Sequence, residues 1–165
     1  MEMYYLKTPL GIAKIIGDEN GISEISVLDE NEVSTDSLLS FGSINVPENL
    51  QETVSQLQDY FDGKRTDFNL RLNPKGTDFQ QKVWKGLLEI PFAKTMSYLE
   101  LSKKLGDVKA IRAVASANGK NPLWIVIPCH RVIGTDGSLT GYAGGLWRKK
   151  WLLEHENPSN QGSLF

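Results

Sequence analysis

The chain has 165 residues, 40% of them hydrophobic, and a formal net charge of −2, which suits one or two small domains with a buried core. Its single cysteine excludes a disulfide framework and any cysteine-rich zinc site, and it fits a reducing compartment. No segment approaches the roughly 20 apolar residues of a membrane-spanning helix, and the N-terminus lacks the apolar core of a signal peptide. We therefore expect a soluble, cytoplasmic protein.

The charge is divided unevenly along the chain. Residues 1–72 hold five Lys and Arg against 13 Asp and Glu, whereas residues 73–165 hold 13 Lys and Arg against seven Asp and Glu. The basic half indicates an anionic partner such as nucleic acid, although dispersed surface lysines give the same count. Because the change falls near the linker-like segment 71–76, we predict two domains, residues 1–72 and 73–165.

The N-terminal half has the pattern of a small α/β domain. Its first 30 residues alternate apolar and polar side chains between the turn signals TPLG and GDENG, which predicts a three-stranded antiparallel meander. Residues 31–46 are polar and serine-rich and are expected to form a loop. A helix is predicted from Pro47 to Gly63, because one face repeats apolar residues at Leu50, Val54, Leu57 and Phe61.

The C-terminal half has the pattern of a mostly helical domain. The segment TDFQQKVWKGLLEI opens with the spacing of a capping box, as does SYLELSKKLG. Asp107 then caps a further helix, VKAIRAVASANG, after a short turn at Gly106. Helix, short turn and helix together predict a helix-turn-helix, although many such pairs bind no nucleic acid. A last helix is expected in GGLWRKKWLLEHE.

The apolar segment PLWIVIPC predicts a buried extended strand that leads into Cys129. A lone cysteine in such a run is commonly a structural thiol. Three kinds of neighbour favour a reactive thiol instead: His130 can act as a base, Arg131 adds positive charge, and Glu154 or Glu156 can orient the imidazole. Adjacent side chains of a strand point to opposite faces, so a bridging water or a turn would be needed between Cys129 and His130.

Two other segments could contact a ligand. The helix AIRAVASANG carries small residues around Arg112, so it either packs tightly on a neighbouring element or lies close to a nucleic acid backbone. Arg112 itself is either a contact to such a ligand or an ordinary solvated charge. The segment GYAGG lacks the spacing of a dinucleotide-binding loop, but its glycines let the backbone approach a flat ligand. Tyr98 is by default a core residue.

Four segments together resemble one family: TDFQQKVWKGLLEIPFAKTMSY, AIRAVASANGKNP, IPCHRVIG and GSLTGYAGGLWRKKWLLEHE. They look like the O6-alkylguanine-DNA alkyltransferases, also called methylated-DNA–protein-cysteine methyltransferases. The resemblance covers residues 77–156, and PCHR followed by Gly-Tyr-x-Gly-Gly is highly specific. It implies an α+β protein whose C-terminal winged helix-turn-helix binds the minor groove of duplex DNA and flips out the damaged base.

The implied reaction is a single in-line transfer of the alkyl group from O6-alkylguanine, and also from O4-alkylthymine, to Cys129, which inactivates the protein. No cofactor is expected, and no zinc, because the N-terminal half lacks both Cys and His. We expect a monomer.

The resemblance also implies roles for individual residues. His130 would take the cysteine proton through water, oriented by Glu156, and Lys149 would help to protonate the leaving oxygen. Arg112 would fill the gap left by the flipped base, and Tyr98 would rotate the 3′ phosphate and contact the base. The other expected substrate and DNA contacts are Ala113 and Ser116 on the small-residue helix, Asn121 in the turn after it, the backbone of Val132 and Ala143, and Tyr142 and Gly144.

The sequence departs from the family pattern at three places. Phe92-Ala93 stands where the family often has Tyr-Gly, Ala143 stands where some members have serine, and Ala115 stands where glycine is more common.

Three other functions stay open. A non-catalytic binder of alkylated DNA would use the same helix pair but needs no nucleophile. A Cys–His hydrolase would turn over many times, and a purely structural domain would keep Cys129 only as a buried thiol.

Overall fold

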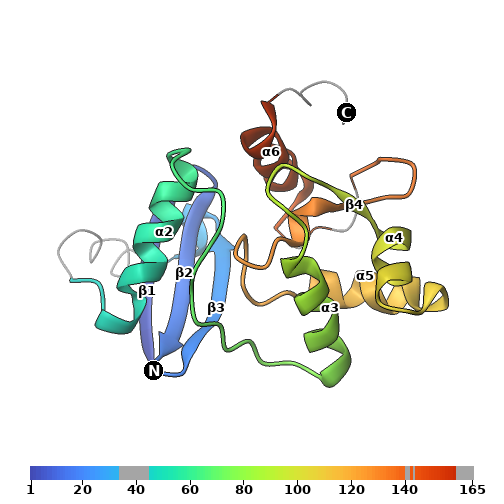
Figure 1. Ribbon diagram of the computed structural model, residues 1–165. Helices are drawn as coiled ribbons and strands as arrows, with labels where there is room; N and C mark the ends of the chain where they lie inside the picture. Colours follow the sequence, from blue (N-terminus) through green and yellow to red (C-terminus); the bar gives the residue numbers. More distant parts are fainter. Residues whose placement is uncertain (34–44, 140–141, 143, 159–165) are drawn as a thin grey trace. The chain divides into compact units, whose positions relative to one another are not determined.

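The computed structural model describes residues 1–33, 45–139, 142 and 144–158, and the chain forms two compact units (Figure 1). The first unit comprises Met1–Lys75 and Pro122–Trp124, and the second comprises Gly76–Asn121 and Ile125–Phe165. The sequence-based boundary between residues 72 and 73 stays a prediction. In the described ranges, no helix is long and apolar enough to cross a membrane.

The first unit is built on the predicted antiparallel meander. Strands β1 (Glu2–Thr8), β2 (Gly11–Asp18) and β3 (Gly21–Leu28) pair in chain order. Gly21 begins β3 at φ 128°, and a Cβ there would lie 2.8 Å from the carbonyl oxygen of Arg71. Only glycine therefore allows the chain after the helix to pass this close to the sheet.

One helix covers a face of this sheet (Figure 1). It begins as a 3-10 turn, η2 (Glu48–Leu50), and continues as α2 (Gln51–Phe61). Leu50, Val54 and Leu57 of its apolar stripe are buried, as the spacing predicted, whereas Phe61 is only half-buried. Of the predicted loop over 31–46, residues 31–32 belong to the 3-10 helix η1 (Glu30–Glu32), and residues 34–44 lie outside the described residues.

The second unit contains the predicted helices. These are α3 (Asp78–Leu88), α4 (Tyr98–Lys104), α5 (Ile111–Gly119) and α6 (Leu146–Glu156), with a 3-10 turn, η3 (Val108–Ala110), before α5. Strands β4 (Met96–Ser97) and β5 (Val132–Ile133) pair in parallel. Both predicted capping boxes form, at Thr77 with Gln80 and at Ser97 with Glu100. The expected α+β fold with a helix-turn-helix of α4 and α5 is confirmed.

The core of the second unit ties the helix-turn-helix to α3. Val83, Trp84 and Leu87 of α3 are buried together with Leu101 of α4 and Val114 of α5. The indole Nε1 of Trp84 donates to the carbonyl oxygen of Ala117 at 2.9 Å. Because this bond joins two helices through a buried polar group, it fixes α5 in rotation as well as in distance.

The approach to Cys129 differs from the prediction. The segment is buried, but it is not an extended strand: residues 124–126 form a turn, in which Ile125 has φ 71°. Pro128 (φ −81°, ψ 63°) then forms an inverse γ-turn, in which the N–H of Cys129 donates to the Ile127 carbonyl at 2.8 Å. A 3-10 helix, η4 (Cys129–Arg131), follows. The apolar composition of this segment correctly predicted that it is buried, but it did not predict its backbone conformation.

Candidate active site

Cys129 occupies the first position of η4 and is 7% exposed. The backbone that leads into Cys129 is held by Asn121, which follows α5: the side-chain amide of Asn121 donates to the Ile127 carbonyl at 2.7 Å. Burial raises the pKa of the Cys129 thiol, while Asn121, Lys149 and Tyr142 act in the opposite direction. A thiol with a raised pKa is protonated at neutral pH, so its use as a nucleophile requires a base.

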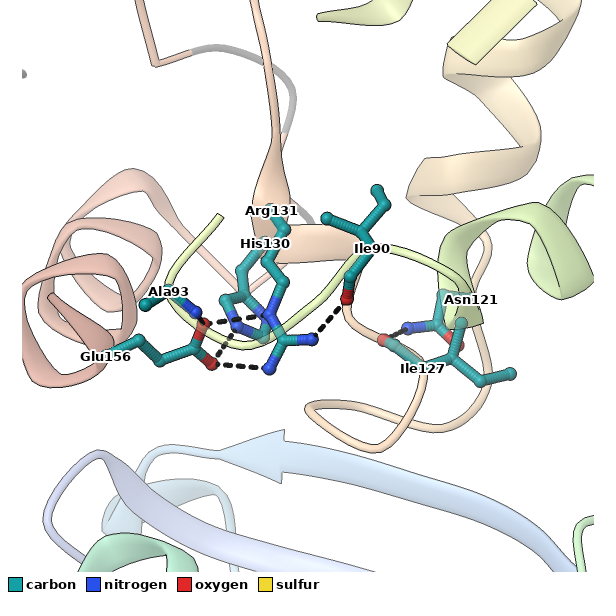
Figure 2. A network of polar contacts seen from close by, with 7 residues as sticks. All are labelled: Ile90, Ala93, Asn121, Ile127, His130, Arg131 and Glu156. Carbon is teal, nitrogen blue, oxygen red and sulfur yellow. Dashed lines mark hydrogen bonds and ion pairs between the residues drawn. The ribbon is translucent and has the colours of Figure 1, made fainter. Parts of the chain in front are cut away.

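A buried base lies next to it in the chain. His130 is 0% exposed, and its Nε2 lies 2.6 Å from Oε2 of Glu156 at the end of α6 (Figure 2). The sequence left Glu154 and Glu156 as alternatives from the residues alone, and the geometry selects Glu156. Consecutive residues of a 3-10 helix do not point to opposite faces as those of a strand do, so the strand-based objection to cooperation between Cys129 and His130 does not apply.

The Glu156 carboxylate collects several donors (Figure 2). Arg131 donates from Nε to Oε1 at 2.8 Å and from Nη2 to Oε2 at 3.0 Å. The backbone N–H of Ala93 donates to Oε1 at 3.3 Å. Although burial raises the pKa of Glu156, the nearby His130 and Arg131 outweigh it and hold that pKa well below its usual value. Glu156 is therefore a carboxylate that can only accept hydrogen bonds.

This arrangement defines the state of the imidazole. Burial lowers the pKa of His130, and it outweighs the opposing effect of Glu156. Because Glu156 accepts the hydrogen bond, Nε2 carries the proton and Nδ1 keeps its lone pair. His130 Nδ1 is buried and has no hydrogen-bond partner within the described part of the chain. A neutral imidazole with an open acceptor nitrogen can receive a proton from a thiol.

Lys149 of α6 supplies a second buried cation. It is 0% exposed, and burial lowers its pKa to about 8, against the opposing effect of Cys129. Its Nζ lies 5.9 Å from the ring centroid of Tyr98 and 6.0 Å from that of Tyr142. The ammonium can therefore stabilise a thiolate at Cys129 or give up a proton near neutral pH.

The remaining predicted residues lie on α5, in β5 and in the segment that precedes α6. Arg112, Ala113 and Ser116 are exposed along one side of α5, while Val114, Ala117 and Asn118 of the same helix are buried. Val132 lies in β5 and is buried. The Gly144 carbonyl accepts from Arg148 at 2.9 Å, and the Tyr142 carbonyl accepts from the N–H of Gly145 at 3.0 Å. Ala143 lies outside the described residues.

Sequence reasoning missed three contributors. Arg131 was expected only to add charge, yet it is bonded to Glu156. Ala93 contributes through its backbone, which no side-chain pattern reveals. Asn118 donates to the Tyr98 hydroxyl at 3.4 Å, and its place on the buried side of α5 was the only available signal. Over the described ranges, no group of three or more His, Cys, Asp or Glu side chains could hold a metal ion.

A buried thiol, imidazole and carboxylate in the same unit as a helix-turn-helix indicate a DNA-binding protein with a nucleophilic cysteine. Comparisons with known proteins agree with this class. The family model described as "6-O-methylguanine DNA methyltransferase, DNA binding domain" matches residues 78–158. The one described as "6-O-methylguanine DNA methyltransferase, ribonuclease-like domain" matches residues 1–74.

Relatives match over nearly the whole chain. The methylated-DNA–protein-cysteine methyltransferase of Methanosarcina barkeri is 43% identical over 159 residues, which is 93% of this chain and 97% of that protein. The crystal structure of the Mycobacterium tuberculosis protein in complex with DNA matches with a TM-score of 0.82 and 39% identity, over 96% of this chain and 94% of that one. The chain belongs to the methylated-DNA–protein-cysteine methyltransferase family, as its sequence motifs predicted.

Proposed function

We propose that this protein repairs duplex DNA by moving an alkyl group from O6-alkylguanine to its own Cys129, once per molecule. The observation that carries the proposal is the buried His130, which follows Cys129 directly in η4, is bonded to Glu156 through Nε2, and has no hydrogen-bond partner at Nδ1 among the described residues. Family membership supports the substrate, since relatives are named for methylated DNA and one is solved in complex with DNA.

DNA binding is assigned to the exposed side of α5. Ala113 and Ser116 are small and exposed, so the helix can seat in the minor groove, where bulky side chains would hold it off. Arg112, exposed on the same helix, enters the stack and fills the gap left by the flipped base. Flipping costs a few kcal/mol of unstacking, and the inserted side chain offsets part of that cost.

Activation of the thiol follows from the hydrogen bonds. The proton leaves Cys129 Sγ and reaches His130 Nδ1 through a bridging water, which leaves a thiolate and an imidazolium. Glu156 holds the ring by its Nε2–H, and the Lys149 ammonium stabilises the thiolate. A buried thiolate is strongly nucleophilic because little water solvates it.

Transfer is one displacement. The thiolate attacks the alkyl carbon in line, the S–C bond forms, and the C–O bond to guanine breaks, with its electron pair going to the guanine oxygen. The guanine takes up one proton, for which Lys149 is the donor we assign, while Tyr98 is assigned to rotate the 3′ phosphate and contact the base. The thioether is stable, so the molecule reacts once. The backbone at Cys129, Val132 and Ala143, with Asn121, Tyr142 and Gly144 around it, is assigned to the base pocket. O4-alkylthymine is proposed as a further substrate.

Mass spectrometry tests the proposal directly. The protein is mixed with a duplex that carries one O6-methylguanine, first at equal amounts and then with DNA in excess. One added methyl group on the Cys129 peptide, with no second turnover, is expected. An intact thiol with DNA bound would leave a non-catalytic binder of alkylated DNA, and turnover without a stable thioether would leave a Cys–His hydrolase.

We also propose that the protein acts as a monomer in the cytoplasm. Its one cysteine must stay reduced to act as a nucleophile, which a reducing compartment ensures. Light scattering of the purified protein tests the first point, and fractionation of cells that express it tests the second.

A further inference from the structure

The guanidinium of Arg131 makes three hydrogen bonds within the site, whereas a residue that only added positive charge would need none. Its Nε and Nη2 contact the two oxygens of Glu156, and its Nη1 donates to the Ile90 carbonyl at 2.7 Å. Its Cζ lies 5.8 Å from the ring centroid of Phe92. Such a two-pronged contact fixes both the position and the plane of the carboxylate. The carboxylate orientation that His130 meets is therefore set by Arg131.

The charges of the cluster make a second point. The guanidinium is always protonated, so the buried pair of Arg131 and Glu156 is neutral. The ionisable and charged groups that act on His130 are Glu156 and Lys149 of α6 and Arg131 of η4, with Cys129 beside it in η4. An imidazolium formed by proton uptake from solvent would add an uncompensated charge to a buried site.

We propose that Arg131 is a positioning residue for alkyl transfer: it orients the Glu156 carboxylate and compensates its charge, so that His130 stays neutral until it receives the Cys129 proton. The inference rests on the proposed function. Without the guanidinium, the negative charge of Glu156 would no longer be compensated by Arg131, and it would favour the uptake of a proton from solvent by His130. A protonated Nδ1 could accept nothing from the thiol.

The proton transfer itself is not opposed by Arg131. When the proton moves from Cys129 Sγ to His130 Nδ1, an imidazolium and a thiolate form together, and the net charge of the site does not change. Arg131 therefore discriminates between two sources of the proton. It disfavours uptake from solvent, which adds charge, and tolerates transfer from the thiol, which does not.

Nuclear magnetic resonance titration of His130 tests this without requiring alkyl transfer. The chain has two histidines, so the variant His155→Asn assigns the imidazole signals. In the wild type we expect the pKa of His130 to lie below 6.5, and a neutral Nε2–H tautomer at pH 7. In Arg131→Gln we expect that pKa to rise by about one unit or more, whereas Arg131→Lys, which keeps the charge, should stay near the wild type.

The rate of alkylation by O6-benzylguanine provides the functional readout. The acid limb of its pH profile should move to higher pH in Arg131→Gln by as much as the His130 pKa moves. Arg131→Lys should be slower than the wild type, because the two-pronged contact is lost, but its acid limb should not move. A purely structural arginine would lower the rate of both variants and shift neither profile.

The outcomes separate the two proposals. If wild-type His130 is protonated at pH 7, or if Arg131→Gln leaves both the His130 pKa and the acid limb unchanged, the role of Arg131 is refuted. If Arg131→Gln does not fold, the wild-type measurement can still refute the proposal, because a protonated His130 at pH 7 contradicts it. If the wild type never alkylates Cys129 while His130 titrates as expected, the proposed function fails and the charge compensation stands.

Discussion

The backbone N–H of Ala93 donates to Oε1 of Glu156, 63 residues further along the chain, at 3.3 Å. Ala93 has φ 67°, in the left-handed region that favours glycine. This is the position at which the family often has glycine, so the turn keeps a glycine-like conformation with an alanine in it. The conformation aims the N–H at the buried carboxylate.

Replacing Ala93 with glycine should therefore stabilise the protein. The left-handed conformation costs a non-glycine residue about 1–2 kcal/mol, which the glycine variant avoids. The greater flexibility of glycine in the unfolded chain opposes this gain by about 0.4–1 kcal/mol. We expect a net gain of about 0.5–1 kcal/mol, or a few degrees in Tm, by scanning calorimetry. Ala115→Gly, inside α5, is the matched control and should lose about 1 kcal/mol. A loss of stability in both variants would contradict the strain at Ala93.

Glu156→Gln should destabilise the protein by about 3–5 kcal/mol, because two buried cationic or hydrogen-bonded partners lose their anion. The pKa of Glu156 is held below its ordinary value of 4.5. Its contribution is therefore fully present above about pH 4.5 and is lost as the pH falls below that value. Denaturant melts between pH 3 and 7 should show this acid limb in the wild type and not in Glu156→Gln. Glu154→Gln, in the same helix, should retain it.

Lys149→Met should make the protein more stable and less reactive. The pKa of Lys149 is lowered to about 8 by burial, so the buried charge opposes folding at pH 7. Between about pH 8 and the ordinary lysine pKa near 10.5, the folded state binds fewer protons than the unfolded state, and stability from this group rises with pH. We expect a gain of about 1–3 kcal/mol at pH 7, and a transfer to O6-benzylguanine slowed about tenfold. Unchanged reactivity would show that Lys149 does not act on Cys129.

Arg112→Ala should weaken repair of duplex DNA far more than reaction with free O6-benzylguanine, because only the duplex requires a base to be flipped. Arg112 is exposed on α5, away from the buried cluster. Parallel single-turnover rates on the two substrates measure the difference. Arg112→Lys keeps the charge and controls for simple attraction to phosphate. Equal losses on both substrates would remove the role in flipping.

Methylation of Cys129 should lower the melting temperature. Cys129 is buried, with 7% of the residue exposed, and an added methyl group in a packed site costs about 1–3 kcal/mol. Calorimetry of fully methylated and fresh protein tests this, and a benzyl group should lower Tm further. Identical melting temperatures would mean that the site has room for the product.

Much of the fold could be predicted from local patterns. Both capping boxes, at Thr77 and Ser97, form as their spacing indicated, because a cap depends only on residues within one helical turn. The meander of β1 to β3 follows from alternation and turn residues, which are equally local. The strand predicted before Cys129 was wrong, since β-branched apolar residues suit any buried backbone, and here a γ-turn at Pro128 and a left-handed Ile125 replace it.

The sequence by itself determined the nucleophile, its neighbouring base and the small-residue helix, because these depend on residue type and on adjacency in the chain. Only the tertiary structure decided that Glu156 and not Glu154 meets His130, that Arg131 is bonded to the same carboxylate, and that the Ala93 backbone completes it. Hydrogen bonds between residues 25 to 63 positions apart depend on how η4, α6 and the turn at Ala93 pack, and no local pattern records that packing.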